Sequence, residues 1–118
     1  MIRIRRIYDP EETGERYKVL IDRLWPRGIS KKNAGCDEWM REIAPADGLR
    51  KWFAHDPGKW EQFKKLYRNE LIQKQEELRR LKLLENLHGT LTLLFAAKDT
   101  VHNNAVVLKE VLQEYKIS

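Results

Sequence analysis

The chain has 118 residues, of which 42% are hydrophobic and 35% are charged. This composition is typical of one soluble domain, which we expect to span residues 1–118. The formal net charge of +5 favours anionic partners, although the basic residues are spread along the chain rather than gathered in one tract.

The compartment follows from what the sequence lacks. Cys36 is the only cysteine, which excludes an internal disulfide and a thiolate metal cluster. No apolar run approaches the roughly 20 residues of a membrane span, and the basic start, Met1 to Arg6, lacks the apolar core of a signal peptide. We therefore expect a cytoplasmic protein with no membrane partner.

Two stretches near the N-terminus predict strands. Ile2 to Tyr8 alternates apolar and basic residues, as in a strand exposed on one side. Val19 to Ile21 are consecutive apolar residues, as in a strand covered on both faces. The link between them is shorter than the dozen residues of a usual parallel crossover, so their relative direction stays open.

The residues after the second strand have the composition of a ligand site. Pro26 and Gly28 cannot continue a strand and force a turn. Four charged or aromatic residues therefore lie at the carboxyl end of this strand, where ligands bind in open α/β sheets: Asp22, Arg23, Trp25 and Arg27.

The middle of the chain predicts short helices. Asp37 to Ile43 has apolar residues at the spacing of one helical face. Asp47 is a suitable N-cap for a second short helix over Leu49 to Phe53. His55 follows it without an obvious packing role and titrates near neutral pH, which makes it a ligand-binding candidate.

A longer helical segment follows. Asp56 before Pro57 is the usual start of a helix, and the apolar stripe that begins at Trp60 is interrupted by a polar stretch at residues 73–75. One helix from Pro57 to Glu85 or two helices in tandem both fit this pattern. Gly89 is a natural C-cap at its end.

The C-terminal third predicts a strand, a polar turn and a helix. Leu91 to Ala97 is a second buried strand, and Asp99 or Thr100 is expected to cap the helix that follows. One face of this helix carries five apolar residues: Val101, Ala105, Leu108, Leu112 and Tyr115. Asn104 lies on the same inward stripe, where an unpaired amide is costly, so it should bond to a specific partner.

These elements predict an α/β fold, a single compact domain in which a small, largely parallel sheet is flanked by helices. The core is expected to contain eight residues: Leu20, Ile21, Phe53, Phe63, Leu93, Leu94, Leu108 and Leu112. If the two buried strands run parallel, their carboxyl ends meet and form one pocket. Carboxylates beside cations and a histidine could then act on a phosphoryl or glycosidic centre.

The pocket supplies the candidate residues. The catalytic candidates are Asp22, Asp99 and His102, and the ligand-binding candidates are Arg23, Trp25, Arg27, His55, Lys98 and Asn104. The structural alternative is that Asp22 pairs with an arginine and Asp99 only caps its helix. No metal site is expected, because the three histidines are too scattered to predict one, and the sequence identifies no cofactor, reaction or oligomeric state.

Three functions stay open. The first is an enzyme acting on a phosphorylated or nucleotide-like substrate, and the second is a non-catalytic module that binds a small anion with the same cations. The third and least favoured is nucleic-acid binding, since no reading helix or stacking motif is recognisable. It would use several basic segments: Arg3, Arg5, Arg6, the loop Ile29 to Gly35, and Arg79 to Lys82.

Four blocks of sequence in order resemble the YeaO-like branch of the domain of unknown function 488 family. They are Val19 to Gly28, Ile43 to Pro45, Leu49 to Pro57 with Trp60, and Leu93 to Asp99 followed by His102 to Ala105. The resemblance runs nearly end to end and implies a compact α/β domain with no established reaction. More distant relatives look as if they carry Cys in the last strand and a Cys-His-Arg run after it. This chain has Ala96, Ala97 and His102-Asn103-Asn104 there, which argues against thiol chemistry.

Overall fold

The fold is built on four parallel strands in the order β1-β4-β2-β3. The computed structural model describes residues 1–117. The strands are β1 (Ile2–Arg6), β2 (Tyr17–Leu20), β3 (Glu38–Trp39) and β4 (Leu91–Phe95). The α-helices are α1 (Asp47–Phe53), α2 (Trp60–Ile72), α3 (Gln75–His88) and α4 (Asn104–Glu114), and three short 3₁₀ helices are η1 (Lys31–Asn33), η2 (Arg41–Ile43) and η3 (Pro57–Lys59).

The strand β4 lies between β1 and β2 and pairs in parallel with both. Ile2 lies opposite Leu91 in one pair, and Tyr17 lies opposite the same Leu91 in the other. The first two strands therefore run in the same direction without touching, which answers the question of direction that the sequence left open. Residues 7–16 connect β1 to β2 without forming a helix. An ion pair with two hydrogen bonds from Arg5 to Glu15, at N–O distances of 2.6 and 3.1 Å, stabilises this connection.

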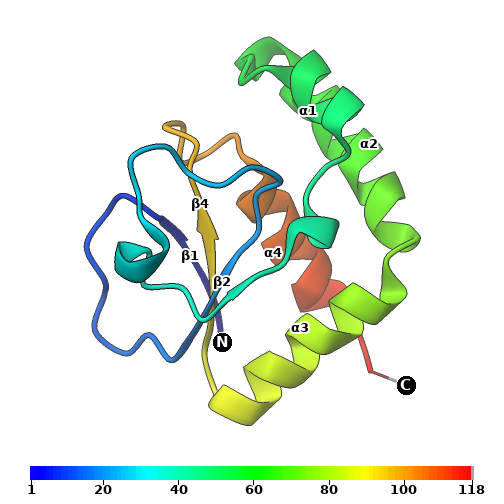
Figure 1. Ribbon diagram of the computed structural model, residues 1–118. Helices are drawn as coiled ribbons and strands as arrows, with labels where there is room; N and C mark the ends of the chain where they lie inside the picture. The colour runs from blue at the N-terminus through cyan, green and yellow to red at the C-terminus, as the bar shows by residue number, and fades with distance from the viewer. Residues whose placement is uncertain (118) are drawn as a thin grey trace.

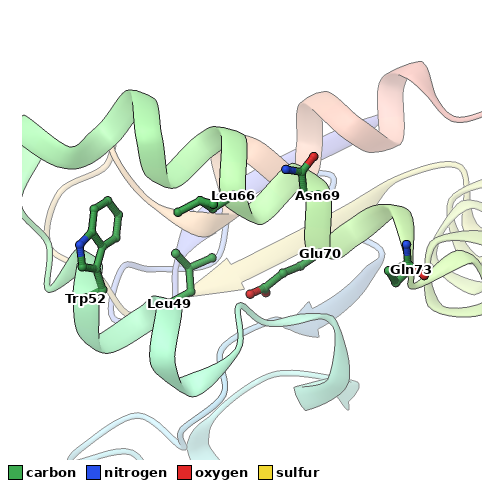
Figure 2. Close-up of a pocket in the computed structure, with 6 residues that line it drawn as sticks. All are labelled: Leu49, Trp52, Leu66, Asn69, Glu70 and Gln73. Carbon is green, nitrogen blue, oxygen red and sulfur yellow. The ribbon is translucent and has the colours of Figure 1, made fainter.

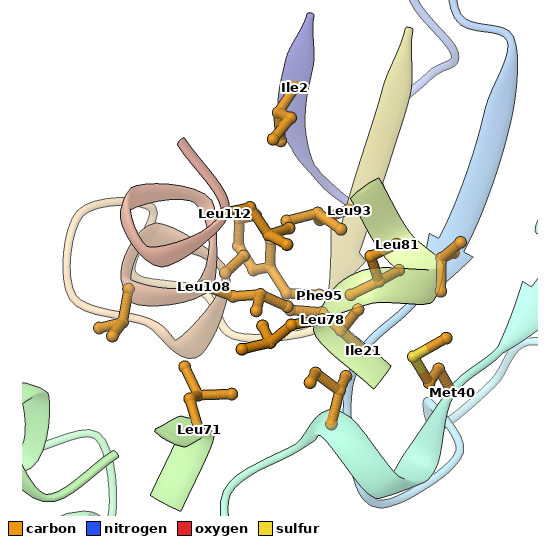
Figure 3. Close-up of a cluster of buried hydrophobic side chains, with 14 of the residues drawn as sticks. Ile2, Ile21, Met40, Leu71, Leu78, Leu81, Leu93, Phe95, Leu108 and Leu112 are labelled. Atoms are coloured by element: carbon orange, nitrogen blue, oxygen red, sulfur yellow. The ribbon is translucent and has the colours of Figure 1, made fainter. Parts of the chain in front are cut away.

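The α/β fold class is confirmed, and its two faces are covered differently (Figure 1). On one face, residues such as Leu93 on β4 and Ile21 directly after β2 pack with residues of α2, α3 and α4 in the main core (Figure 3). On the other face, Leu20 and Leu94 pack in a smaller cluster under the loop of residues 24–36. All eight residues predicted for the core are buried, which confirms that prediction. Among the helices of residues 1–117, none is both long and apolar enough to cross a membrane.

The helix predicted over Asp37 to Ile43 is wrong. Its first part is the edge strand β3, and its last part is η2. The main-chain N–H groups of Asp37 and Met40 bond to the carbonyl oxygens of Lys18 and Leu20 on β2, at 2.8 and 2.9 Å, so the free edge of β2 draws this segment into the sheet. Trp39 packs in the smaller cluster while Met40 packs in the main core, the alternation of a strand.

The long helical segment is two helices, α2 and α3, which meet at Gln73 and Lys74. The break falls in the polar stretch seen in the sequence. The two predicted ends of this segment are confirmed: Asp56 accepts a hydrogen bond from the Gly58 N–H, and Gly89 ends α3 with a positive φ of 82°.

Several predicted boundaries are wrong at the residue level. The strands predicted over Ile2 to Tyr8 and Val19 to Ile21 are Ile2–Arg6 and Tyr17–Leu20. Asp47 is the first residue of α1 rather than its cap, and it bonds to Arg50 instead. Strand β4 stops at Phe95, because the next N–H, that of Ala96, bonds to Asp22. Asn103, and neither Asp99 nor Thr100, caps α4 by accepting a bond from the Val106 N–H. Two residues expected on that helix lie outside it, Val101 in the exposed preceding turn and Tyr115 at the C-cap.

Candidate functional site

A cleft of about 1040 Å³ opens at the carboxyl ends of the strands. Its walls come from the segments that follow β1, β2 and β4, from the end of α1 and from the start of α4. Eight of the nine residues singled out from the sequence line it: Asp22, Arg23, Trp25, Arg27, His55, Lys98, Asp99 and Asn104. His102 is the one that does not.

Asp22 joins three elements at the floor of the cleft. Its Oδ2 accepts a hydrogen bond from the Ala96 N–H after β4 at 2.9 Å, and its Oδ1 accepts one from the Asn104 amide on α4 at 3.2 Å. Burial raises the pKa of this carboxyl, while these two bonds and the nearby charges of His55 and Arg50 act in the opposite direction. Asp22 therefore does not pair with an arginine, contrary to the structural alternative considered from the sequence.

Asn104 has the specific partners that its position required. Its Nδ2 donates to the Ile21 carbonyl at 3.0 Å as well as to Asp22. The amide thus ties the first turn of α4 to the end of β2. This agrees with the sequence prediction, and it holds Asp22 in place from the side of the helix.

Asp99 and His102 bond to each other and to the main chain within one turn. Asp99 Oδ1 accepts bonds from the N–H groups of Val101 and His102, both at 2.9 Å, and its Oδ2 lies 2.8 Å from His102 Nδ1. The two main-chain bonds, followed by the His102 side chain, lower the pKa of Asp99 to about 2. The His102 ring stands edge-on to Trp60, with centroids 5.3 Å apart. Sequence reasoning placed His102 in the pocket, and the structure places it behind the Asp99 turn.

The three predicted cations differ in what holds them. Arg23 donates to the carbonyl oxygens of Pro45 and Ala44, at 2.9 and 3.2 Å, so backbone dipoles fix it, and no carboxylate of residues 1–117 forms an ion pair with it. Within residues 1–117, the side chains of Arg27 and Lys98 have no hydrogen-bond or ion-pair partner. The turn that carries Arg27 is itself anchored, because the Tyr8 hydroxyl donates to the Arg27 carbonyl at 2.7 Å.

Trp25 lies between the cleft and the smaller cluster. Its Nε1–H donates to the Ile29 carbonyl at 2.6 Å, and its ring packs edge-on against Trp39, with centroids 5.2 Å apart. The indole is thus fixed at the wall of the cleft.

His55 lies on a strained part of the wall. Ala54 and His55 both have positive φ, 46° and 58°, in the left-handed region that residues with a Cβ rarely adopt. The strain turns the chain sharply between α1 and η3, and it carries the exposed His55 ring into the lining of the cleft. His55 was predicted from the sequence as a ligand-binding residue, but its left-handed backbone conformation was not predicted.

The lining residues that were not predicted as site residues include Arg6, Tyr8, Arg50 and Lys51. Arg6 and Tyr8 follow β1, and they belong to the cleft because β1 is parallel to β4, which the sequence left open. Arg50 and Lys51 pair with Asp47 at the end of α1. With them, six cations and two carboxylates line the cleft, so its wall carries an excess of positive charge.

The basic segments considered for nucleic-acid binding are largely engaged within the chain. Arg5 is buried in its ion pair with Glu15, and Arg6 donates to the carbonyl oxygens after β4. Arg80 pairs with Glu38 and Lys82 with Glu85. This pattern does not favour the nucleic-acid hypothesis, which needs these cations free.

Two further features of the described residues concern metal binding and a second hollow. In the described part of the chain, no group of three or more His, Cys, Asp or Glu side chains is placed to hold a metal ion. A second hollow of about 620 Å³ lies between α1 and α2, lined by Leu49, Trp52, Leu66, Asn69, Glu70 and Gln73 (Figure 2). None of the residues singled out from the sequence lines it, and no basic residue does.

Comparison with known proteins supports the resemblance seen in the sequence. A family model described as the inactive DUF488-N3 subclade matches residues 1–117. The uncharacterised protein YeaO of Escherichia coli K12 is 42% identical over 112 residues, which cover 95% of this chain and 96% of YeaO. An uncharacterised protein of Mycobacterium tuberculosis H37Rv, Rv3073c, is 30% identical over 113 residues, or 94% of this chain and 92% of that protein. No solved structure matches the chain.

Proposed function

Given that this chain belongs to the family described as the inactive DUF488-N3 subclade, we propose that its cleft binds a small phosphate-bearing anion without converting it. The observation that carries the proposal is the pair of free cations, Arg27 and Lys98, on the wall of a cleft with excess positive charge. Unpaired cations in a concave site are expected to attract and hold an anion.

The fixed groups around these two cations support the same function. Arg23 is already oriented by two carbonyl oxygens, so it can add a positive charge to a bound anion with little loss of side-chain freedom. Arg27 supplies a planar guanidinium, which can donate two parallel hydrogen bonds to a phosphate. The cleft therefore combines one cation held in a fixed orientation, Arg23, with two cations that are free to move, Arg27 and Lys98.

The carboxylates favour binding over catalysis. Asp99 already accepts three bonds in its own turn, and its lowered pKa makes it a poor proton acceptor at neutral pH. Its predicted partner His102 lies outside the lining. The name of the family model, an inactive subclade, agrees with this assignment.

Asp22 is the observation that favours the second candidate, an enzyme acting on a phosphorylated or nucleotide-like substrate. Its carboxyl lines the cleft, and burial raises its pKa above the ordinary aspartate value, a perturbation that is common among catalytic carboxyls. Incubation of the protein with phosphate monoesters and nucleosides, followed by chromatography, distinguishes the two. Product formation that Asp22→Asn abolishes would favour the enzyme.

Isothermal titration calorimetry with inorganic phosphate and adenosine monophosphate tests the binding function. We expect saturable binding by the unmodified chain, and we expect the double variant Arg27→Gln, Lys98→Gln to bind at least tenfold more weakly. The matched control is Arg16→Gln, Lys31→Gln, which removes two exposed cations outside the cleft. Absence of binding to either probe, or equal weakening in both double variants, would overturn the proposal.

A further inference from the structure

The floor of the cleft presents hydrogen-bond acceptors. A ligand that binds there therefore needs hydrogen-bond donors in addition to its phosphate. The Asn104 amide is oriented by its surroundings, because the group bonded to the Ile21 carbonyl and to the Asp22 carboxylate must be the NH₂ donor. The other end of the amide, Oδ1, accepts no hydrogen bond from residues 1–117, and it is not among their buried unpaired atoms. An acceptor therefore stays open beside the cleft.

Asp22 adds acceptors next to it. Each of its carboxylate oxygens accepts one protein hydrogen bond, which leaves further lone pairs for a ligand. The Asp22 oxygens and Asn104 Oδ1 belong to two side chains that are bonded to each other, so the open acceptors lie side by side. Two adjacent acceptors match two adjacent donors on the ligand.

The charge of the cleft selects the kind of donor. The six cations of the lining oppose an ammonium group at this position, and one of them, Arg50, acts on Asp22 together with His55. Neutral hydroxyl groups donate without this repulsion, and a carboxylate bound to sugar hydroxyls is the usual partner of a ribose in α/β nucleotide sites. Vicinal hydroxyls therefore fit the two acceptors better than an amine does.

The size and apolar lining of the cleft also require more than an inorganic anion. A volume of about 1040 Å³ is that of a site for a whole organic ligand, and Trp25, Phe53 and Tyr8 contribute aromatic surface to it. We infer, on the basis of the proposed function, that the ligand is a sugar phosphate of the nucleoside monophosphate kind. Its vicinal ribose hydroxyls donate to Asp22 and Asn104 while its phosphate binds Arg27 and Lys98.

Calorimetry on the full chain tests this with ligand analogues, so the result does not depend on the folding of a variant. The probes are inorganic phosphate, ribose 5-phosphate, adenosine monophosphate, its 2′,3′-dideoxy analogue and inosine monophosphate. We expect the dideoxy analogue to bind about tenfold more weakly or worse than adenosine monophosphate, because it leaves acceptors unpaired. Inosine monophosphate, which lacks the exocyclic amine, should bind as adenosine monophosphate does.

The outcomes separate this inference from the proposed function. If no phosphate compound binds, the proposed function fails and the inference fails with it. If the dideoxy analogue binds as tightly as adenosine monophosphate, the inference fails while the anion site stands. If inosine monophosphate alone binds weakly, the acceptors read a base amine, and the assignment of the hydroxyls is wrong.

A pair of variants assigns the effect to the floor of the cleft. In Asp22→Asn we expect the preference for adenosine monophosphate over its dideoxy analogue to shrink at least threefold. Asp9→Asn, which removes an exposed carboxylate outside the cleft, should keep the full preference. An unchanged preference in a folded Asp22→Asn variant, as judged by circular dichroism, would exclude Asp22 as the acceptor.

Discussion

The Asp22 carboxylate accepts the main-chain N–H of Ala96 at 2.9 Å, which joins the end of β2 to the end of β4 through a side chain. This bond takes up the first main-chain N–H after the last residue of β4. It also holds an acidic group in a place where its ionised form is poorly solvated. The acid–base behaviour of the fold depends on this arrangement.

We expect Asp22 to titrate above the ordinary aspartate value of about 3.9, since burial raises its pKa in the folded chain. A group whose pKa is higher in the folded state stabilises the fold at low pH, and this contribution is lost as pH rises from about 3.9 through the folded pKa. The carboxyl ¹³C shift of Asp22, followed by NMR against pH, measures this. A midpoint at or below about 3.9 would contradict it.

Replacing Leu94 by Ala should lower the free energy of unfolding by about 2–5 kcal/mol, because Leu94 is fully buried between β4 and the loop that covers it. Urea unfolding followed by circular dichroism measures the change. Leu87→Ala is the control, because Leu87 is 76% exposed, and surface changes usually stay within about 0.5 kcal/mol. A loss below that figure for Leu94→Ala would mean that the second face of the sheet carries no core.

Arg27→Lys should weaken phosphate binding and leave the melting temperature almost unchanged. The Arg27 side chain has no partner among the described residues, so the fold does not depend on it. A lysine keeps the charge but cannot form two parallel bonds to a phosphate. Calorimetry and thermal melting measure the two quantities, with Arg16→Lys as the control. A fall of several degrees in the melting temperature would show a structural role for Arg27.

Trp25 should report ligand binding by its fluorescence, because its indole forms part of the cleft wall. The chain has four tryptophans, so the measurement is the difference between the unmodified chain and Trp25→Phe on addition of adenosine monophosphate. We expect most of the emission change to disappear in this variant and to persist in Trp52→Phe, since Trp52 lies outside the cleft. Equal responses in the unmodified chain and Trp25→Phe would place the ligand away from Trp25.

Ala54→Gly should raise the free energy of unfolding by up to about 1 kcal/mol, because glycine adopts the left-handed conformation at φ 46° without the penalty of a Cβ. Chemical unfolding of the variant measures this gain. Lys51→Gly, in the last turn of the same helix, should have the opposite effect and cost about 1 kcal/mol. A loss of stability in Ala54→Gly would mean that the Ala54 methyl group, and not backbone strain, dominates at this position.

The sequence predicted the parts of the fold that depend on local pattern. Apolar runs located β2 and β4, and the residues that follow them located most of the cleft. Arg6 and Tyr8 were missed because their place depends on the direction of β1, which only its pairing with β4 determines. The segment around Trp39 was misassigned for a similar reason, since the open edge of β2 is a partner that helical spacing does not reveal.

In the candidate site, too, local sequence pattern predicted some features, while others depended on the assembled sheet. Asn104 could be predicted to need a partner from its inward position alone, but that Asp22 is one of those partners required the assembled sheet. Asp99 and His102 are three residues apart and were expected to face a ligand, whereas they satisfy each other and the main chain between them. Short-range hydrogen bonds of Asp side chains compete with more distant uses of the same carboxylate.

Because β4 lies in the middle of the sheet and is the last strand to be synthesised, the sheet can form completely only late in translation. The two partners of β4, strands β1 and β2, are synthesised first, yet Ile2 and Tyr17 both lie opposite Leu91. Strand β1 has no strand partner before β4 has left the exit tunnel, and until then β2 can pair only with the two-residue strand β3. Contacts across nearly ninety residues of sequence also slow folding, because a long loop must close before they form. The nascent chain therefore carries β1 unpaired until β4 emerges. The basic side chains of β1 are charges that discourage strand pairing between molecules, and they lie on the strand that stays unpaired for longest.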